Sequence, residues 1–546
     1  MKRRILIAAL ALVLAVGGIA ALNIHTASKA TSVEMQVISS TGDASAAEGL
    51  LVDHRIMLGG NLLWYTDYVP ATGESDTNFY VTYRSIQQQP YYRWQDGETD
   101  ETRLTCSAVD GENRNDPIVK ELWAEAERSD ASLPYVSRRI DPIDYYDTYP
   151  MYLAGSWGSG CLSADYSAEL AFDKLRIPVG KYDFAELSLY ISWDSDGATK
   201  VDSVGIRSFY MQNRFTPYCV NSGDHILVTA GFPADVQPQP DWAPEGFGLW
   251  DMPVHEVRET VGGGYTVRYL PSTAESRLVY PLDIETQRVA LLEQSSDGKQ
   301  ILLVTVEEGR FVLHVLDSAD YHLMQRLDID GAEARESSDT KYYIEYYIDG
   351  WSAGFGDFRP VEEDWSGYRI NPPQDEQGVT FTCEYREYPS VSMRQGDGFL
   401  VLLMDSSRVA LLTPDGEGYK GEFVCDAPDY SYVENKDGTQ SGRYFLYHDE
   451  RDEVEYYALW SAIPTADATY AMAYNGRYLA MAAYAEDRDL LVSVFGKDGL
   501  QYAAYVRSSI TTQLGDGAYS FSPVWKDVSI SDANNDAPRP GLIWQN

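Results

Sequence analysis

Three stretches of the chain repeat one order of apolar and polar positions. They start at Gly298, Gly398 and Gly476, and each runs through an apolar segment, a short polar loop, a second apolar segment, an Asp-containing turn and a segment of alternating polarity. Apolar runs of about six residues bounded by Asp-Gly or Asn-Gly are typical of strands joined as hairpins. Glycine suits turn positions where φ is positive. An alternating third strand is typical of a sheet with one wetted face. The pattern therefore predicts repeated antiparallel sheets.

Two further stretches match this pattern less closely. One is Gly60 with NLLWYTDY and NFYVTYRS, and the other is Gly223 with DHILVTAGF, continued by FGLWDMPVHEVRE. The segment SLYISWDSDG predicts another hairpin between residues 90 and 200. One such sheet cannot bury both of its faces, whereas radial stacking of several sheets buries them. We therefore predict an all-β protein, a β-propeller of six to eight blades with seven preferred.

The repeats are longer than those of compact propellers. The turn glycines of consecutive repeats from Gly223 onward lie 75 to 100 residues apart, against about 40–50 residues for compact propeller repeats. The sheets therefore carry insertions, which we place near residues 90–150, 232–246 and 331–375. The first insertion holds an Asp-Pro pair followed by IVKELWAEAER, which predicts one short inserted helix over 117–128, because Asp is a good N-cap and proline is favoured at the first helical position.

The repeats resemble a known superfamily. The segments VLHVLDSADYHLMQRL, ALLTPDGEGYKGEFV and VSVFGKDGLQYAAYV are similar to blades of the WD40-like and YVTN-like β-propeller superfamily, although the chain has no Gly-His and Trp-Asp signature. The whole chain also resembles uncharacterised membrane-anchored surface propellers of Gram-positive bacteria. A resemblance of this kind implies a fold and leaves the activity open.

The N-terminus has the pattern of an export signal. Lys2, Arg3 and Arg4 precede an uncharged apolar run from Ile5 to Leu22. Its 18 residues exceed the usual core of a signal peptide, about 7–15 residues, and just reach the length of a spanning helix. A transmembrane signal anchor and a cleaved signal peptide both remain open. The predicted divisions are the signal anchor or signal peptide (1–26), a polar tether (27–49), the β-propeller (50–530) and a C-terminal tail (531–546).

Charge and the N-terminal signal together restrict location and partners. On either interpretation the rest of the chain leaves the cytoplasm, since the basic residues stay inside. The product is then a single-pass protein of the cell membrane with an extracytoplasmic C-terminal domain, or a secreted protein if the signal is cleaved. The chain carries 43 Lys and Arg against 83 Asp and Glu, a net charge of −40, which disfavours nucleic acid. A protein or a neutral glycan remains as partner, with membrane contact through the N-terminal helix only.

Motifs for catalysis and cofactors are weak. Ala154, Ser156 and Gly158 form a loose nucleophile-elbow pattern, but the strand and helix that such an elbow needs are not predicted around it, and we expect a turn. No pair of the five cysteines has CxxC spacing, and no two of the seven histidines have metal-ligand spacing on one helix. We expect no catalytic residues and no cofactor other than calcium.

Calcium is the one ion that the sequence leaves open. Asp194, Asp196 and Asp202 resemble part of a calcium loop. An EF-hand loop requires a bidentate Glu at its last position, where Ser203 stands. These three residues are therefore weak metal candidates, and an Asp-Gly hairpin turn is the alternative.

The most aromatic insertion is the first candidate for ligand contact. It runs over 342–358 as YYIEYYIDGWSAGFGDF, and the candidate residues there and just beyond it are Tyr346, Tyr347, Trp351, Phe355 and Trp365. Tyr and Trp suit binding sites because they combine apolar area with a polar edge. A buried strand pair is the alternative.

We expect a non-enzymatic binding or scaffold module at the cell surface. The alternatives are a glycan-acting hydrolase and an extracytoplasmic sensor subunit that works with a partner protein.

Overall fold

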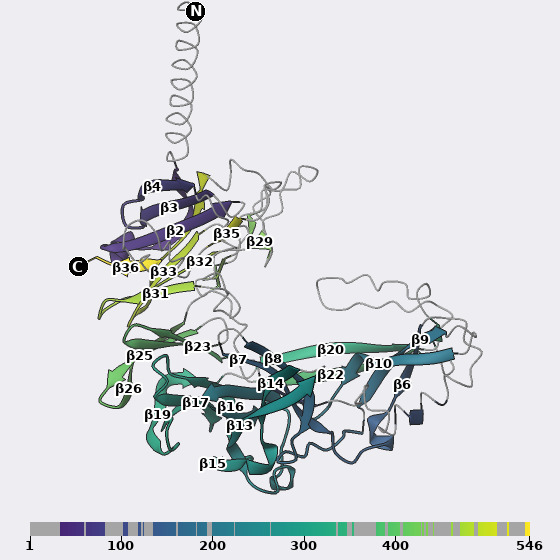
Figure 1. The fold of residues 1–546 in the computed structure, drawn as a ribbon. Coiled ribbons are helices and arrows are strands. Elements are labelled where there is room, and N and C mark those ends of the chain that lie inside the picture. The colour runs from purple at the N-terminus through teal and green to yellow at the C-terminus, as the bar shows by residue number, and fades with distance from the viewer. Residues whose placement is uncertain are drawn as a thin grey trace, which may run out of the picture. The chain divides into compact units, whose positions relative to one another are not determined.

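The structure is a computed structural model. It describes residues 33–58, 62–81, 102–106, 118, 120–121, 124, 135–159, 162–181, 183–193, 199–222, 224–261, 264–334, 337–346, 352–353, 378–387, 391–404, 408–426, 429–430, 433–434, 440–441, 460–461, 470–484, 490–509, 521–523 and 541–545. The chain forms two compact units, a terminal unit of Met1–Gln95 with Ser390–Asn546 and a central unit of Asp96–Pro389. Antiparallel strands make up most of the described residues of both units (Figure 1). The all-β class predicted from the sequence is confirmed.

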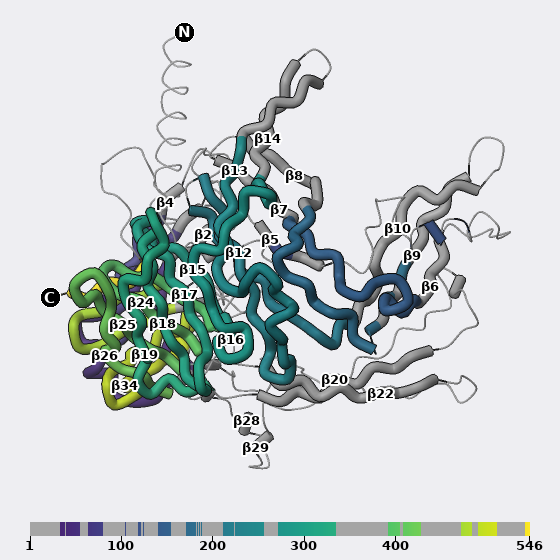
Figure 2. Tube along the Cα trace, turned by 90° about the horizontal axis from the view of Figure 1, so that it is seen from below, coloured from purple at the N-terminus to yellow at the C-terminus, as the bar shows by residue number. Residues whose placement is uncertain are grey.

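The first repeat of the sequence forms a four-stranded antiparallel sheet in the central unit (Figure 2). Its strands, in spatial order, are β16 (Gln287–Gln294), β17 (Gln300–Glu307), β18 (Arg310–Asp317) and β19 (Leu323–Glu333). Gly298 has a φ of +72° in the turn that joins β16 to β17, as predicted. Every residue from Ile301 to Val306 in β17 is buried, whereas β19 has many exposed positions. The inner strands therefore pack on both faces, and the fourth strand meets solvent.

The adjoining sheet of the central unit contains the repeat that starts at Gly223. Its strands are β11 (Thr216–Ser222), β12 (His225–Gly231), β13 (Phe247–Val261), β14 (Gly264–Pro271) and β15 (Arg277–Leu282). The long strand β13 pairs with β12 and β15 through its first half and with β14 through its second half. The insertion at 232–246, predicted as a contact element, places Phe232, Val236 and Trp242 in the hydrophobic core. Part of this insertion therefore supports the fold.

The remaining sheets of the central unit are smaller. One sheet contains β5 (Thr102–Cys106), β7 (Met151–Ser159) and β8 (Leu162–Ala171). A second contains, in spatial order, β10 (Thr199–Tyr210), β9 (Phe184–Trp193), β6 (Tyr135–Ile140) and β21 (Ser352–Ala353). A third pairs β20 (Ser337–Tyr346) with β22 (Gly378–Glu387). The predicted hairpin SLYISWDSDG is confirmed by β9 and β10. The turn predicted around Ser156 is wrong, because this residue lies within β7 and pairs with Asp165 of β8.

Helical structure is sparse among the described residues. Ile118, Lys120, Glu121 and Ala124 are α-helical, which agrees with the helix predicted over 117–128. Ile118 is fully buried in the core of the central unit. Short 3-10 turns complete the described elements: η1 (Ala44–Ala47), η3 (Pro142–Asp144), η4 (Pro240–Trp242) and η5 (Thr273–Glu275).

The terminal unit contains the other two strong repeats. Their strands are β23 (Val391–Gly396), β24 (Phe399–Met404), β25 (Arg408–Asp415) and β26 (Gly418–Asp426), and β31 (Tyr470–Tyr474), β32 (Leu479–Tyr484), β33 (Leu490–Gly496) and β34 (Gly499–Ser508). Gly398 and Gly476 have φ values of +77° and +88°, again as predicted. Two short pairs join β27 (Asp429–Tyr430) to β30 (Trp460–Ser461) and β28 (Val433–Glu434) to β29 (Gln440–Ser441).

The two ends of the chain exchange strands inside the terminal unit. The N-terminal strand β1 (Met35–Gly42) pairs with β34 as the fifth strand of a sheet of C-terminal strands. The opening repeat forms β2 (Leu50–Leu58), β3 (Leu62–Val69) and β4 (Glu74–Val81), and the C-terminal strands β35 (Phe521–Pro523) and β36 (Leu542–Trp544) both pair with β2. Parts of the segments assigned from the sequence to a polar tether and a polar tail are thus strands of the fold.

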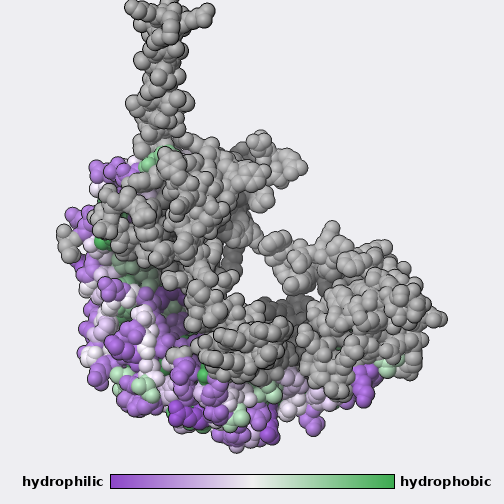
Figure 3. All heavy atoms as spheres, in the orientation of Figure 1, coloured by the Kyte–Doolittle hydropathy of each residue, from purple (hydrophilic) through white to green (hydrophobic). Residues whose placement is uncertain are grey.

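The structure bears on the predicted membrane segment and on the surface only through the described residues. The N-terminal segment 1–26 lies outside the described residues. The described part of the chain contains no helix with the length and apolar character that a membrane span requires. Figure 3 shows a mainly hydrophilic surface over the described part of one face. The large apolar residues exposed among the described residues are Val37, Ile38, Ile143 and Leu323, so they are scattered across the two units.

Candidate functional site

A buried carboxylate organises one end of the adjoining sheets of the central unit. Asp251 lies within the apolar strand β13, and its side chain is 1% exposed. Its Oδ1 accepts a hydrogen bond from Nδ1 of His225 at 2.7 Å. Its Oδ2 accepts from Nε and Nη2 of Arg277 at 3.0 and 2.9 Å. His225 begins β12 and Arg277 begins β15, so three neighbouring strands supply these groups.

A tyrosine from the next sheet completes this group. Tyr321 lies in the turn between β18 and β19 with a φ of +61°, and its hydroxyl donates to Oδ1 of Asp251 at 3.3 Å. Burial and the charge of Asp251 raise the pKa of Tyr321 above its ordinary value, so the hydroxyl remains a donor at physiological pH. We call His225, Asp251, Arg277 and Tyr321 the Asp251 cluster. Arg277 and His225 are 65% and 32% exposed, so the buried carboxylate holds two side chains that reach solvent.

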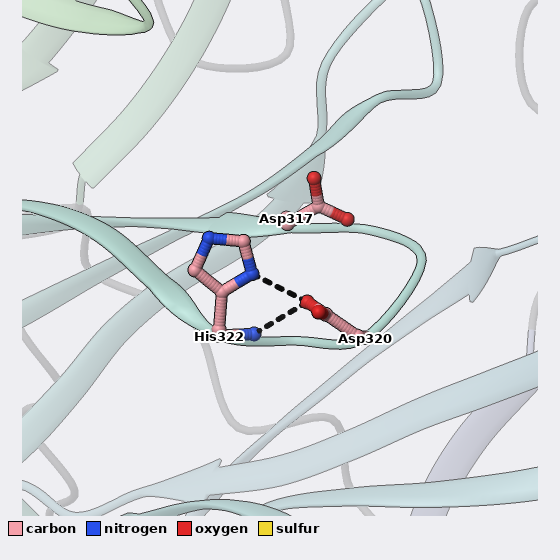
Figure 4. A group of neighbouring side chains, drawn as sticks. All are labelled: Asp317, Asp320 and His322. Atoms are coloured by element: carbon pink, nitrogen blue, oxygen red, sulfur yellow. Dashed lines mark hydrogen bonds and ion pairs between the residues drawn. The ribbon is translucent and has the colours of Figure 1, made fainter.

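The turn that carries Tyr321 also gathers a second group, the turn cluster of Asp317, Asp320 and His322 (Figure 4). Their potential ligand atoms lie within 4.8 Å of one another. Nδ1 of His322 lies 2.5 Å from Oδ1 of Asp320, and hydrogen bonds from the side chain and backbone of His322 lower the pKa of Asp320. Oδ1 of Asp317 accepts from the backbone N–H of Ala319 at 2.7 Å. These contacts fix the loop, and the carboxylates and imidazole are ligand types for a cation.

Neighbouring turns meet at the same end of the two sheets. Nε2 of Gln294, at the end of β16, donates to the hydroxyl of Ser222, at the end of β11, at 3.1 Å. Asp224 lies two residues after Ser222, and the Asp224 side chain is 86% exposed. Asp297 lies in the next turn, where hydrogen bonds from Ser295 and Lys299 lower its pKa to about 2. We call this end of the two sheets the loop end. It comprises the Asp251 cluster, the turn cluster and the turn residues Ser222, Asp224, Gln294 and Asp297. Its carboxylates outnumber its Lys and Arg side chains, so it is locally acidic.

A separate polar network lies inside the sheet of β16–β19. Oε1 of Glu307 accepts from Gln287 at 2.8 Å, and its Oε2 accepts from Arg326 at 2.7 Å. His314 lies 2.9 Å from Glu307 through Nε2 and 2.9 Å from the hydroxyl of Tyr280 through Nδ1. Burial alone raises the pKa of Glu307, but hydrogen bonds led by that from Arg326 lower it to about 2. His314 is 1% exposed, so this network supports the sheets and meets solvent through Arg326 and Tyr280.

The cavity found in the central unit is small. It has room for about 10 Å³ and is lined mainly by apolar residues, together with Thr229 and Lys174. A volume of this size accommodates about one water molecule. Lys174 lies 5.6 Å from the ring centre of Trp250 and bonds to Glu245 at 2.9 Å. This cavity is therefore too small for a sugar or a peptide side chain.

The candidate residues of the sequence fall largely outside the described part of the chain. Tyr347, Trp351, Phe355, Trp365, Asp194 and Asp196 all lie outside it. Tyr346 is the last residue of β20, which pairs with β22, and Asp202 lies in β10. The backbone at Tyr346 therefore belongs to a strand pair, the alternative weighed for the aromatic segment. The binding and calcium roles of these residues stay predictions.

The Asp251 cluster could not be recognised from local motifs. Its residues come from β12, β13, β15 and a turn about 70 residues beyond Asp251. One signal was present in the sequence. Asp251 interrupts the apolar run FGLWDMPV, and a charge within an otherwise apolar strand requires partners when it is buried.

Comparisons with known proteins give structural similarity alone. No family model matches the chain, and no curated protein sequence matches it. Similar solved structures include TolB from Acinetobacter baumannii, with 11% identity, coverage of 84% of this chain and 82% of the other, and a TM-score of 0.16. A putative 6-phosphogluconolactonase from Bacteroides fragilis has 10% identity, 84% and 97% coverage and a TM-score of 0.23.

A third similar structure is described as a β-propeller. It is the β-propeller domain of Cps50 from Myceliophteria thermophila, with 8% identity, coverage of 60% of this chain and 82% of the other, and a TM-score of 0.17. TM-scores this low carry no argument about how the sheets are arranged or what the protein does.

Proposed function

We propose that the chain is a β-propeller that serves as a non-enzymatic binding or scaffold module on the outer side of the cell membrane. Two features support the propeller. Several sheets in both units are antiparallel meanders of four or five strands, the form of propeller blades. The exchange of β1 and β36 between N-terminal and C-terminal sheets is what a ring requires, because its first and last blades are neighbours. Six to eight blades remain our proposal.

The loop end of the central unit is the proposed binding surface. The observation that carries this is the buried carboxylate of Asp251, which holds His225 and Arg277 at fixed positions where both meet solvent. Polar groups positioned by a buried partner favour recognition, because little ordering is left for the moment of binding. The acidic surroundings favour a protein or a neutral glycan as ligand and disfavour nucleic acid.

Hydrolysis is the second candidate, and the Asp251 cluster is the observation that favours it. A carboxylate that accepts from Nδ1 of a histidine orients Nε2 as a general base, and Asp251 does this to His225. The described residues include no Ser, Thr or Cys side chain hydrogen-bonded to His225. We therefore place the binding module ahead of a hydrolase that uses a covalent intermediate.

The test combines binding and turnover on the same purified chain. We would apply it to an array of neutral glycans and to purified peptidoglycan, and would place a photo-crosslinking residue at the exposed position 319 in cells to capture a protein partner. The proposal expects retention on a glycan or a crosslinked partner of defined mass. The substitutions Asp320→Ala and His322→Ala should weaken binding, and Glu285→Ala, an exposed carboxylate outside the loop end, should not. Release of sugar products would overturn the non-enzymatic function.

Membrane attachment forms part of the proposal. The basic residues and the 18-residue apolar run at the N-terminus support a single-pass anchor with the β-structure outside. Cell fractionation tests it. An anchored chain remains with membranes after a high-salt wash, whereas a chain found wholly in the medium excludes the anchor and supports a cleaved signal.

A further inference from the structure

We propose that His225 and Asp224 bind a divalent transition-metal ion of the Zn²⁺ class at the loop end, with Asp251 orienting the imidazole. The two ring nitrogens of His225 have unequal contacts. Nδ1 lies 2.7 Å from Oδ1 of Asp251, which is a short hydrogen bond. Nε2 lies 3.5 Å from Oδ1 of Asp224. The second distance exceeds the usual 2.7–3.2 Å range of an N–H···O hydrogen bond.

The longer distance fits two ligands of one metal ion. Zn²⁺ binds imidazole nitrogen and carboxylate oxygen at about 2.0–2.2 Å with tetrahedral geometry. Two such atoms on one ion are then about 3.3–3.6 Å apart, and the observed separation of Nε2 and Oδ1 is 3.5 Å. A water molecule that bridged the two atoms with hydrogen bonds of about 2.8 Å at a tetrahedral angle would hold them about 4.6 Å apart. The observed separation is therefore too short for a bridging water and lies within the range for two ligands of one cation, as well as within that of a direct ion pair if the imidazole is protonated.

The hydrogen bond between His225 and Asp251 is a second observation, independent of the distance from Nε2 to Asp224. Such a hydrogen bond is typical of metal-binding histidines. A histidine that ligates a metal through one nitrogen usually donates its other N–H to a carboxylate or carbonyl, which fixes the tautomer and makes the free nitrogen more basic. Asp251 provides this contact from a buried position, with its side chain 1% exposed. Arg277 and Tyr321 hold the same carboxylate. The orienting group is thus fixed before any ion arrives.

The residue types decide the class of ion. Imidazole with carboxylate suits Zn²⁺, Ni²⁺ and Cu²⁺, whereas Ca²⁺ and Mg²⁺ prefer oxygen ligands alone. Asp224 is 86% exposed and His225 is 32% exposed, so the other positions on the ion face solvent. Those positions accept water or a donor atom from a bound partner. Metal binding at His225 goes beyond the proposed binding function and does not depend on it.

The turn cluster is the competing location for the same ion. There, Nδ1 of His322 is already hydrogen-bonded to Asp320, and both side chains are more than half exposed. The Asp251 cluster differs because its orienting carboxylate is buried. Separate variants at His225 and His322 distinguish the two locations, since each removes one imidazole from the loop end.

Calorimetric titration of the purified full-length chain with ZnCl₂ alone tests the proposal. We expect one site that is lost in His225→Ala and weakened in Asp224→Asn. Asp251→Asn should weaken binding by about 10- to 100-fold. His255→Ala is the matched control, because Nε2 of this exposed histidine makes an ordinary 3.1 Å contact with Glu275, and it should retain full affinity.

Two results would overturn the proposal. One is the absence of measurable Zn²⁺ binding by the wild-type chain, and the other is affinity that survives in His225→Ala, whether or not it is lost in His322→Ala. Thermal unfolding of each variant without metal shows whether it is folded, and Asp224→Asn is the variant least exposed to this problem because its side chain is 86% exposed. A Co²⁺ spectrum with no thiolate charge-transfer band separates this site from binding by cysteine. The glycan and crosslinking experiments contain no added metal, so a failure here leaves the binding module standing.

Discussion

Nε2 of His314 lies 2.9 Å from Oε1 of Glu307 inside the sheet of β16–β19. Because the pKa of Glu307 is lowered to about 2, its carboxylate is an acceptor at physiological pH and Nε2 is the donor. Burial lowers the pKa of His314 against the opposing effect of Glu307, so the ring is neutral and Nδ1 accepts from the hydroxyl of Tyr280. Two sheets of the central unit are therefore joined by one directed chain of hydrogen bonds.

Removing this carboxylate should destabilise the central unit. Glu307→Ala leaves donors from His314, Gln287 and Arg326 without their shared acceptor. An unsatisfied buried donor costs about 1–3 kcal/mol, and this applies to His314 and Gln287, whereas Arg326 is 41% exposed and can be solvated instead. We expect the free energy of unfolding to fall by about 3 kcal/mol in urea denaturation. Glu333→Ala, an exposed position on β19, should change it by less than about 0.5 kcal/mol. Equal effects would mean that the network contributes nothing.

The buried His54 should make stability depend on pH. Burial lowers the pKa of His54 from 6.5 to about 4. The unfolded chain binds a proton below pH 6.5 and the folded chain does so only near pH 4, so stability is lost as pH falls through this window. The shift corresponds to about 3 kcal/mol at pH 4. Urea unfolding between pH 7 and pH 4 should show a smaller decline in His54→Leu than in the wild type. Parallel pH profiles would contradict a role for this residue.

The glycine turns should be sensitive to a single methyl group. Gly298 has a φ of +72°, a conformation that other residues adopt with strain, although the added carbon would meet no close atom. Gly298→Ala should lower the free energy of unfolding by about 1 kcal/mol. Gly421 has neither a positive φ nor a neighbour within 4 Å of an added Cβ, so Gly421→Ala is the control and should leave stability close to that of the wild type. A Gly298→Ala variant as stable as this control would show that the turn relaxes without cost.

Local pattern was enough to predict the inner strands of the sheets. Residues 301–304 and 399–404 are continuous apolar runs next to glycine turns, and they lie in β17 and β24 as expected. The strand before the turn glycine carried a weaker signal in the repeat that starts at Gly398. In this strand, β23, the polar Ser392 and Arg394 flank Met393, which is its single buried residue.

The Asp251 cluster could not be predicted from local sequence pattern, for a different reason. Asp251 pairs with Arg277 across two strands, and Tyr321 reaches it from another sheet. Nothing in the spacing of these residues indicates that they meet, since the meeting depends on how β13 lies between β12 and β15. The last C-terminal strand was not predicted either, because the three residues Leu542–Trp544 are too few to show a period.

The C-terminal strand offers a direct test of the strand exchange. Leu542 is 3% exposed and lies in one hydrophobic cluster with Leu50 and Val52, and Nε1 of Trp544 donates to the carbonyl of Ala473 at 3.1 Å. Leu542→Ala should lower the free energy of unfolding by about 2–4 kcal/mol, because it removes buried methyl groups and leaves a cavity. Gln545→Ala, at an exposed neighbouring position, should have almost no effect on thermal unfolding. A tail that merely extends from the fold would give the same melting temperature for both variants, whereas a strand that closes the terminal unit separates them by several degrees.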